Sequence, residues 1–180
     1  KLKHVVITSV DRDDLDDGGA DHFSKVIHEV KKLNLNTTVE VLTPDFLRKG
    51  NAYKKVLDAK PDVFNHNIET VPRLYTVVRP GARYFASLEL LKNAKKENRK
   101  IFTKSGIMVG LGEKKDEVLK TMDDMVEHGL HILTIGQYLQ PTKMHIEVDD
   151  FITPEVFEMY KEEGLSSGLK YVESGPLVRS

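Results

Sequence analysis

The run VVITSV at residues 5–10 is a continuous stretch of β-branched and small residues near the start of the chain. It shows no alternation between apolar and polar positions, a pattern typical of a parallel strand that is covered on both faces. A polar segment at 11–19 follows, and apolar residues then recur at helical spacing from Phe23 to Leu33. The opening of the sequence therefore predicts a strand, a loop and a helix.

The same unit recurs along the rest of the chain. Further strands are predicted at 38–42, 63–65, 101–106, 132–136 and 171–173, and helices at 52–59, 71–77, 85–94, 118–126 and 156–164. Strands separated by helices form right-handed parallel crossovers, so the predicted fold is α/β with a parallel sheet, either open and doubly wound or curled into a full or partial barrel. No Gly/Ser-rich or Pro-rich linker interrupts the pattern, and residues 1–180 are predicted to form a single domain.

Composition narrows the class of protein. A chain of 180 residues with 39% hydrophobic residues is sufficient for one globular domain. The 27 basic and 28 acidic residues leave no positive field that would hold a nucleic acid. Charges interrupt the apolar runs before the ~20 residues that a membrane helix requires, and no secretory signal opens the chain. We therefore expect a cytoplasmic protein that binds neither nucleic acid nor membrane.

Polar residues gather just after the predicted strands. Ligands of parallel α/β folds bind at the carboxyl ends of the strands, so these side chains are expected to line one rim. The candidates are Thr8, Ser9, Asp11, Asp13, Thr43, Asp45, Asn65, His66, Asn67, Glu69, Lys104, Ser105, Gln137, Gln140 and Ser174. So much hydrogen-bonding capacity on one rim favours a binding or catalytic function over a structural one.

Three segments of this rim allow more than one interpretation. The acidic run at 11–17 lacks the ligand spacing of a calcium loop, and most of its carboxylates fit a solvated loop before a helix. The glycine-rich stretch 106–113 matches neither a phosphate loop nor a dinucleotide fingerprint, and it could approach a flat ligand or form a tight turn. The segment 65–69 could bind ribose hydroxyls or form an Asx-type turn, with His66 as a hydrogen-bonded structural histidine.

Lys104 follows a predicted strand and has two interpretations of its own. A desolvated lysine at this position could form a Schiff base, which would make the protein a (βα)-barrel lyase of the aldolase type that needs neither cysteine nor metal. A lysine at a strand end is more often the charge partner of an anionic ligand.

Six strings, distributed in order along the whole chain, resemble one family. They are VVITSVDRDDLDDGG at 5–19, VLTPDF at 41–46, DVFNHNIETVP at 62–72, TKSGIMVGLGE at 103–113, LTIGQYLQPT at 133–142 and SGPLVRS at 174–180. Together they resemble the lipoyl synthase family of the radical S-adenosylmethionine (SAM) superfamily. Agreement of several unrelated strings in the same order is more specific than any one of them.

The resemblance implies a partial parallel (βα)6 barrel of the radical SAM, TIM-barrel-like type. It also implies an enzyme that inserts two sulfur atoms, at carbons 6 and 8, into an octanoyl chain attached to a carrier lysine. The carrier would be a lipoyl domain or the glycine-cleavage H protein, and flavodoxin or ferredoxin would supply electrons. One 4Fe-4S cluster would cleave S-adenosylmethionine to a radical that abstracts hydrogen, and a second, auxiliary 4Fe-4S cluster would donate the sulfur.

The chain contains no cysteine, which bears directly on these cofactors. Iron–sulfur clusters are held by thiolates. The resemblance implies a Cys-x3-Cys-x2-Cys loop after the first barrel strand and a further cysteine triplet for the auxiliary cluster, and neither occurs in these residues. We therefore expect the N-terminal βα unit to be missing, the sequence to begin near the second barrel strand, and the chain as given to be inactive.

The resemblance also assigns site residues. For S-adenosylmethionine, Thr8 and Ser9 would contact the amino acid part. The ribose or a carboxylate would be contacted by Asn65, Asn67, Glu69 and Lys104. The adenine side would be lined by the stretch 106–113, with Gly106, Met108 and Gly110, and by Gln137 and Tyr138.

Two further roles follow from the resemblance. Ser180 matches the first serine of a motif that ligates the auxiliary cluster, although the ligand could be the residue after it. The arginines that could contact an acidic carrier are Arg79, Arg83 and Arg179. The alternatives to a sulfur-inserting enzyme are the Schiff-base lyase that uses Lys104 and a non-catalytic module that binds S-adenosylmethionine or a carrier domain.

Overall fold

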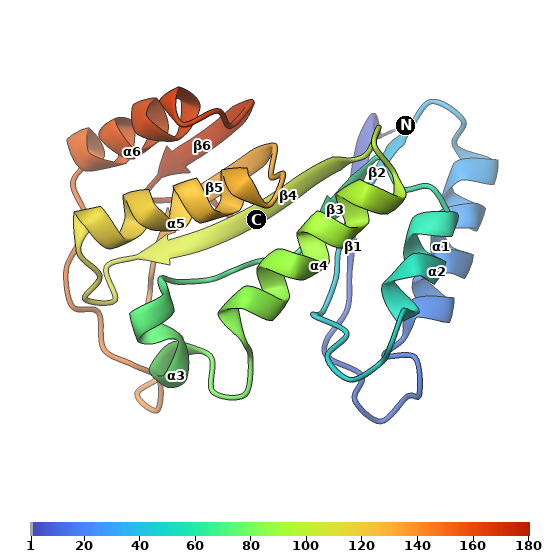
Figure 1. Cartoon of the computed structure of the whole chain (residues 1–180), viewed down its shortest axis with the longest axis horizontal. Coiled ribbons are helices and arrows are strands. Elements are labelled where there is room, and N and C mark those ends of the chain that lie inside the picture. Colours follow the sequence, from blue (N-terminus) through green and yellow to red (C-terminus); the bar gives the residue numbers. More distant parts are fainter. Residues whose placement is uncertain (1) are drawn as a thin grey trace.

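The computed structural model describes residues 2–180 and contains a sheet of six parallel strands that pair in sequence order. The strands are β1 (His4–Thr8), β2 (Thr38–Leu42), β3 (Val63–Asn65), β4 (Phe102–Val109), β5 (Ile132–Gln137) and β6 (Tyr171–Gly175). The helices are α1 (Ala20–Leu33), α2 (Ala52–Asp58), α3 (Tyr75–Val78), α4 (Tyr84–Glu97), α5 (Lys115–Glu127) and α6 (Pro154–Ser166), and a 3-10 turn, η1 (Pro72–Leu74), precedes α3. Figure 1 shows this alternation of strands and helices along the chain.

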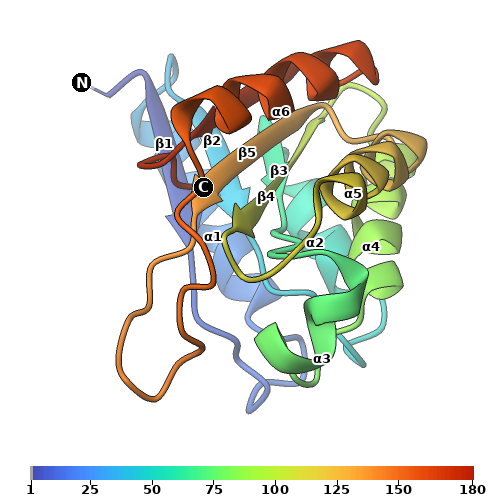
Figure 2. The same ribbon diagram turned by 90° about the vertical axis from the view of Figure 1, so that its left-hand side faces the viewer.

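The helices wrap around the outside of the curved sheet, as Figure 2 shows. Side chains alternate between the two faces of each strand. Those directed toward the helices form one apolar core with no exposed surface at Val39, Val41, Phe64, Leu133 and Ile135. The opposite, inner face carries polar residues and lines the interior of a partial barrel. The predicted parallel barrel is therefore confirmed, and the doubly wound alternative is not.

The prediction for the first strand was wrong in one respect. β1 is the edge strand of the sheet, and none of its residues is fully buried. Val6 on its inner face is 48% exposed. The β-branched run predicted a strand correctly, but it does not distinguish a strand covered on both faces from one whose inner face is open to solvent.

The fourth strand is longer than predicted. β4 continues past Gly106 to Val109, because β5 offers pairing partners as far as Gln137. Lys104 is consequently the third residue of an eight-residue strand and lies inside the barrel, below the predicted rim. In the described part of the chain, no helix combines the length and the apolar composition needed to cross a membrane.

Candidate functional site

Two adjoining cavities at the carboxyl ends of the strands form what we call the mouth of the barrel. The larger, about 210 Å³, is lined by residues from β4, β5 and the C-terminal segment, and the smaller, about 160 Å³, by residues that follow β1 and β2. Asn67 and Glu69 line both cavities and therefore join them. Of the predicted residues, the mouth brings together Thr8, Ser9, Asp11, Thr43, His66, Asn67, Glu69, Arg79, Gly106, Met108, Gln137, Arg179 and Ser180. The predicted cofactor contacts that do not line it are Asn65, Lys104, Gly110 and Tyr138.

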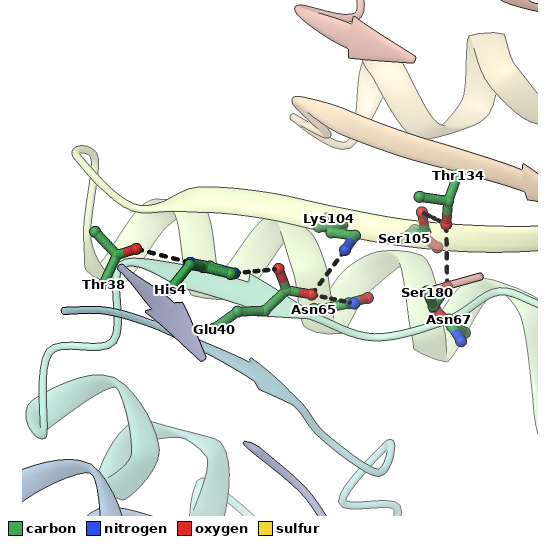
Figure 3. Close-up of polar contacts among 9 residues, drawn as sticks. All are labelled: His4, Thr38, Glu40, Asn65, Asn67, Lys104, Ser105, Thr134 and Ser180. Atoms are coloured by element: carbon green, nitrogen blue, oxygen red, sulfur yellow. Dashed lines mark hydrogen bonds and ion pairs between the residues drawn. The ribbon is translucent and has the colours of Figure 1, made fainter. Parts of the chain in front are cut away.

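Ser180 lies across the inner face of the sheet at Gly106. Its hydroxyl donates a hydrogen bond to Asn67 Oδ1 at 2.9 Å and lies 3.0 Å from Thr134 Oγ1 (Figure 3). A β-carbon at position 106 would collide with the Ser180 hydroxyl and would lie 2.9 Å from both Asn67 Oδ1 and Thr134 Oγ1. Glycine is therefore required where three polar groups approach the backbone.

Glu69 holds an unusual backbone conformation in the mouth. Its φ angle is 74°, a left-handed value that costs energy for a residue with a side chain. The conformation is fixed by two hydrogen bonds, from Glu69 N to Gly106 O at 2.9 Å and from Met108 N to Glu69 O at 2.8 Å. Burial raises the pKa of the Glu69 carboxyl, and the nearby Arg79 charge opposes this shift. A strained, half-buried acid of this kind is a candidate for contact with a cationic ligand.

A polar cluster, which we call the lumen cluster, lies below the mouth on the inner face of β1 to β4. Its centre is the buried carboxylate of Glu40, which accepts hydrogen bonds from Asn65 Nδ2 at 2.8 Å and from Lys104 Nζ at 2.9 Å (Figure 3). The second carboxylate oxygen lies 3.4 Å from Nε2 of His4. The other ring nitrogen of His4, Nδ1, is 2.7 Å from Thr38 Oγ1. Sequence reasoning missed Glu40, although a lone acid inside the apolar strand TVEVL is a signal that could have identified it.

Asn65 has one polar atom without a partner. Its amide nitrogen is committed to Glu40, and its oxygen is buried with no hydrogen bond among the described residues. In Figure 3 this oxygen points away from Glu40, toward the end of the sheet where Asn67 and Ser180 lie. An unpaired buried acceptor is costly. Asn65 has no exposed surface and lines neither cavity of the mouth, so its contact with a ligand stays a prediction.

Lys104 does not have the environment of a Schiff-base lysine. Its side chain is 13% exposed and forms an ion pair with Glu40, in which the ammonium form donates to the carboxylate. A Schiff base requires a neutral amine with a free lone pair. The pairing equally reduces the charge that Lys104 could offer to the carboxylate of a ligand. The lyase alternative therefore lacks structural support.

The glycine stretch divides between its two interpretations. Gly106 and Met108 belong to β4 and line the mouth, in agreement with close approach to a ligand. Gly110 and Gly112 form a tight turn, each with φ 94°. The carboxylate of Glu113 accepts hydrogen bonds from Gly110 N at 2.7 Å and Leu111 N at 2.9 Å, so these two amides of the turn are already occupied.

Gln137 and Tyr138 hold the segment 139–153 in place. Gln137 Nε2 donates to Asp150 O at 3.0 Å, and its Oε1 accepts from Ile152 N at 2.9 Å. The hydroxyl of Tyr138 donates to Ile146 O at 2.8 Å. Gln137 lines the mouth, but its side chain is committed to the protein, so a contact of either residue with a purine stays a prediction.

His66 is the structural histidine that the sequence predicted. It is buried in the wall of the smaller cavity, with Nδ1 donating to Thr43 O at 2.9 Å and Nε2 lying 2.9 Å from the hydroxyl of Ser87. Burial lowers the pKa of His66 to about 4, against a weaker opposing effect of its hydrogen bond to Thr43. His66 is therefore neutral in the folded protein at neutral pH.

This lowered pKa predicts acid sensitivity. Between pH 6.5 and about 4 the unfolded chain binds a proton at His66 and the folded protein does not, so stability present above pH 6.5 is lost as the pH falls. The free energy of unfolding should fall between pH 7 and pH 4.5 in the parent protein and in His66→Gln. We expect this decrease to be about 2 kcal/mol smaller in the variant than in the parent protein. Urea unfolding at both pH values measures this, with the exposed His22→Gln as control. An equal decrease in His66→Gln and the parent protein would contradict the assignment.

The three arginines occupy different places. Arg79 donates to Asn67 O at 2.9 Å and lines the smaller cavity of the mouth. Arg179 lines the larger cavity and donates to Val178 O at 2.7 Å. Arg83 immediately precedes α4 and is exposed. A role of these residues in carrier binding stays a prediction.

The fold is shared with solved structures of low sequence identity. Methylornithine synthase (PylB) has a TM-score of 0.70 and 14% identity, over 99% of this chain and 58% of its own. A domain of pyruvate-formate lyase-activating enzyme from Bacteroides vulgatus has a TM-score of 0.68 and 9% identity, over 94% of this chain and 98% of its own. Streptococcus suis SuiB, bound to precursor peptide SuiA, has a TM-score of 0.67 and 11% identity, over 96% of this chain and 38% of its own.

These likenesses establish the fold alone, and the chain spans 58% of methylornithine synthase, the first of these structures. The sequence itself matches the family model described as the radical SAM superfamily over residues 1–125, which is more than half of the chain. The parallel barrel, the polar mouth and this match lead to one conclusion: the chain belongs to the radical SAM superfamily.

Proposed function

We propose that this protein is a radical SAM enzyme of the lipoyl synthase type, which inserts two sulfur atoms into an octanoyl chain on a carrier lysine. One observation carries the proposal. Four of the six strings that resemble this family, at 62–72, 103–113, 133–142 and 174–180, contribute side chains to a single cavity of the mouth. Residues that far apart in sequence converge there because successive parallel strands end at the same edge of the sheet.

Membership of the superfamily implies an enzyme that uses S-adenosylmethionine and a 4Fe-4S cluster. The mouth fits S-adenosylmethionine on two grounds. The Glu69 carboxyl lines both cavities and can face a cationic group, and Ile107 and Met108 line the larger cavity beside the polar side chains of Asn67 and Ser180, which places apolar contacts next to hydrogen-bonding groups. S-adenosylmethionine supplies, on one-electron reduction, a carbon radical that abstracts hydrogen from an unactivated C–H bond.

The residues of the mouth have defined tasks in this proposal. The Glu69 carboxylate attracts the positive charge of the ammonium or sulfonium group. Asn67 lines both cavities and offers its side-chain amide to a ribose hydroxyl. Met108 and Ile107 line the same cavity and exclude water, which protects the reacting C–H bond from competing reactions.

The residues present do not fit a 4Fe-4S cluster. The sequence has no cysteine, and the described residues contain no group of three or more His, Asp or Glu side chains placed to hold a metal. We therefore derive no step through a cluster from this chain. A second, auxiliary cluster with Ser180 among its ligands, and electron delivery by flavodoxin or ferredoxin, are parts of the proposal that await experiment.

Sulfur insertion is tested directly with the complete natural protein after reconstitution with iron and sulfide. The substrates are an octanoylated lipoyl carrier domain or H protein, S-adenosylmethionine and a chemical reductant. We expect mass spectrometry of the carrier to show the gain of two sulfur atoms on its acyl chain. Cleavage of S-adenosylmethionine without sulfur gain would keep the superfamily assignment and contradict the lipoyl synthase proposal.

Glu69→Gln is expected to weaken binding of S-adenosylmethionine to the complete protein about tenfold, because it removes the charge that faces the ligand's cation. Since burial raises the pKa of Glu69, binding by the parent protein should also weaken as the pH falls toward this pKa, and the variant should lose this dependence. Isothermal titration calorimetry across pH measures both effects. Glu158→Gln, an exposed change on α6, is the control, and equal affinities for Glu69→Gln and the parent protein would refute this role.

A further inference from the structure

We propose that a cavity of about 630 Å³ beside the mouth, here called the side pocket, binds the peptide segment of the substrate protein that carries the acylated lysine, with an acidic residue of that segment paired to Arg48. This inference rests on the proposed function, because it requires a substrate that is attached to a protein. It adds a second binding site, distinct from the cofactor site in the mouth.

Three loops build the side pocket. They are the segment after β1, with Asp11 and Asp13, the segment after β2, from Pro44 to Lys49, and the segment between α3 and α4, from Arg79 to Ala82. All three lie at the carboxyl ends of the strands. The side pocket therefore shares the rim with the mouth.

The side pocket is continuous with the mouth. Asp11, Pro44 and Arg79 line both the side pocket and the smaller cavity of the mouth, which in turn shares Asn67 and Glu69 with the larger one. A ligand that starts in the side pocket can thus extend along the rim through the smaller cavity as far as Glu69, at the border of the larger cavity that the proposed function assigns to S-adenosylmethionine. This shape suits a long side chain, such as an acyl-lysine, whose attachment point stays outside the mouth.

The charges of the side pocket favour a peptide over a polyanion. Four basic residues line it, but three acidic ones, Asp11, Asp13 and Asp45, lie among them. A polyphosphate or nucleic acid would be repelled by these carboxylates. A peptide can satisfy both signs, because its N–H groups donate to carboxylates while an acidic side chain accepts from a guanidinium.

Arg48 is the basic residue available for that pairing. Arg12 is paired with Asp14, Lys49 donates to the carbonyls of Asp13 and Leu15, and Arg79 donates to Asn67 O. Among the described residues, Arg48 has no carboxylate within ion-pair distance, and its side chain is exposed. A guanidinium without a protein partner can bind a carboxylate of a ligand with two parallel hydrogen bonds.

The loop that carries Arg48 is held in a strained shape. Phe46 and Arg48 have φ angles of 50° and 64°, which non-glycine residues rarely adopt. Phe46 is buried against Gly18, where an added β-carbon would lie 3.2 Å from its ring, and Lys49 ties this loop to the segment after β1. Strain that is held by such contacts is typical of a preorganised binding site.

The test uses the complete protein and two synthetic peptides that carry an octanoyl-lysine next to either aspartate or asparagine. We expect the parent protein to bind the aspartate peptide more tightly than the asparagine peptide. Arg48→Gln should weaken binding of the aspartate peptide about tenfold and leave the affinity for the asparagine peptide unchanged. Arg48→Lys should restore part of the affinity. Arg99→Gln, an exposed arginine before β4 and outside the side pocket, should change neither peptide. Fluorescence anisotropy measures all four proteins.

The outcomes separate this inference from the proposed function. If both peptides bind equally to the parent protein and to Arg48→Gln, or if neither binds while sulfur insertion into the carrier proceeds, the side pocket is not the peptide site and the proposed function stands. If sulfur insertion fails and the charge-dependent binding is observed, the peptide site stands and the lipoyl synthase proposal falls.

Discussion

Glu40→Leu is expected to lower the free energy of unfolding by about 3–5 kcal/mol, the range for removal of one partner from a buried ion pair. The Lys104 ammonium, 13% exposed, would lose its carboxylate, and the Asn65 amide would lose its acceptor. Each of these groups would remain desolvated without compensation. Urea unfolding monitored by circular dichroism measures the change, and a loss below about 1 kcal/mol would contradict the prediction.

Two control variants separate the cost of leaving a buried charge unpaired from the contribution of an ion pair as such. In the Glu40→Leu/Lys104→Met double variant no unpaired charge remains, so we expect much of the stability to return, although the Asn65 amide still lacks its acceptor. Glu97→Leu removes a partner from the exposed pair of Lys54 and Glu97, which are 2.6 Å apart and 41% and 44% exposed. Solvent screens this surface pair, so its removal should leave the free energy of unfolding nearly unchanged.

Gly110→Ala is expected to destabilise the protein by about 2–4 kcal/mol through two additive causes. The φ angle of 94° is unfavourable for any residue with a β-carbon. The added methyl group would also collide with Gln137 Nε2 and with the backbone oxygen of Asp150. Since Gln137 anchors the segment 139–153, the change should also release this segment.

Gly81→Ala isolates the backbone contribution. Gly81 has a similar φ angle of 95°, but an added β-carbon there meets no atom within 4 Å. We expect this variant to lose only about 1 kcal/mol, the cost of the φ angle alone. Hydrogen exchange should show faster exchange at 139–153 in Gly110→Ala only. Equal stability losses for the two variants would show that the contacts of Gly110 contribute nothing.

The sequence predicted the architecture because strand and helix patterns are local. The five predicted strands after the first, and the helix of each unit, are all present near their predicted positions, although β4 continues beyond its predicted end. The helix predicted at 71–77 is η1 followed by α3. The common edge for polar residues was predictable as well, since it follows from parallel topology. His66 was interpreted correctly because it follows a buried strand amid polar neighbours.

The errors concern properties that depend on distant residues. The end of β4 is set by the length of β5, so Lys104 could not be placed inside the barrel from its own neighbours. The role of Gln137 depends on Asp150 and Ile152, which belong to a loop without periodicity. Glu40 stands in a strand that otherwise predicts a fully apolar environment. Its partner Lys104 is 64 residues away, and only the folded sheet shows that the two charges meet.

The order of the strands bears on how the protein is made. Each strand from β2 to β6 pairs with the strand that precedes it in the sequence. Each new βα unit can therefore dock onto an edge that already exists when it leaves the ribosome, without waiting for a strand from the far end of the chain. Assembly can thus advance with translation, one unit at a time from the N-terminus.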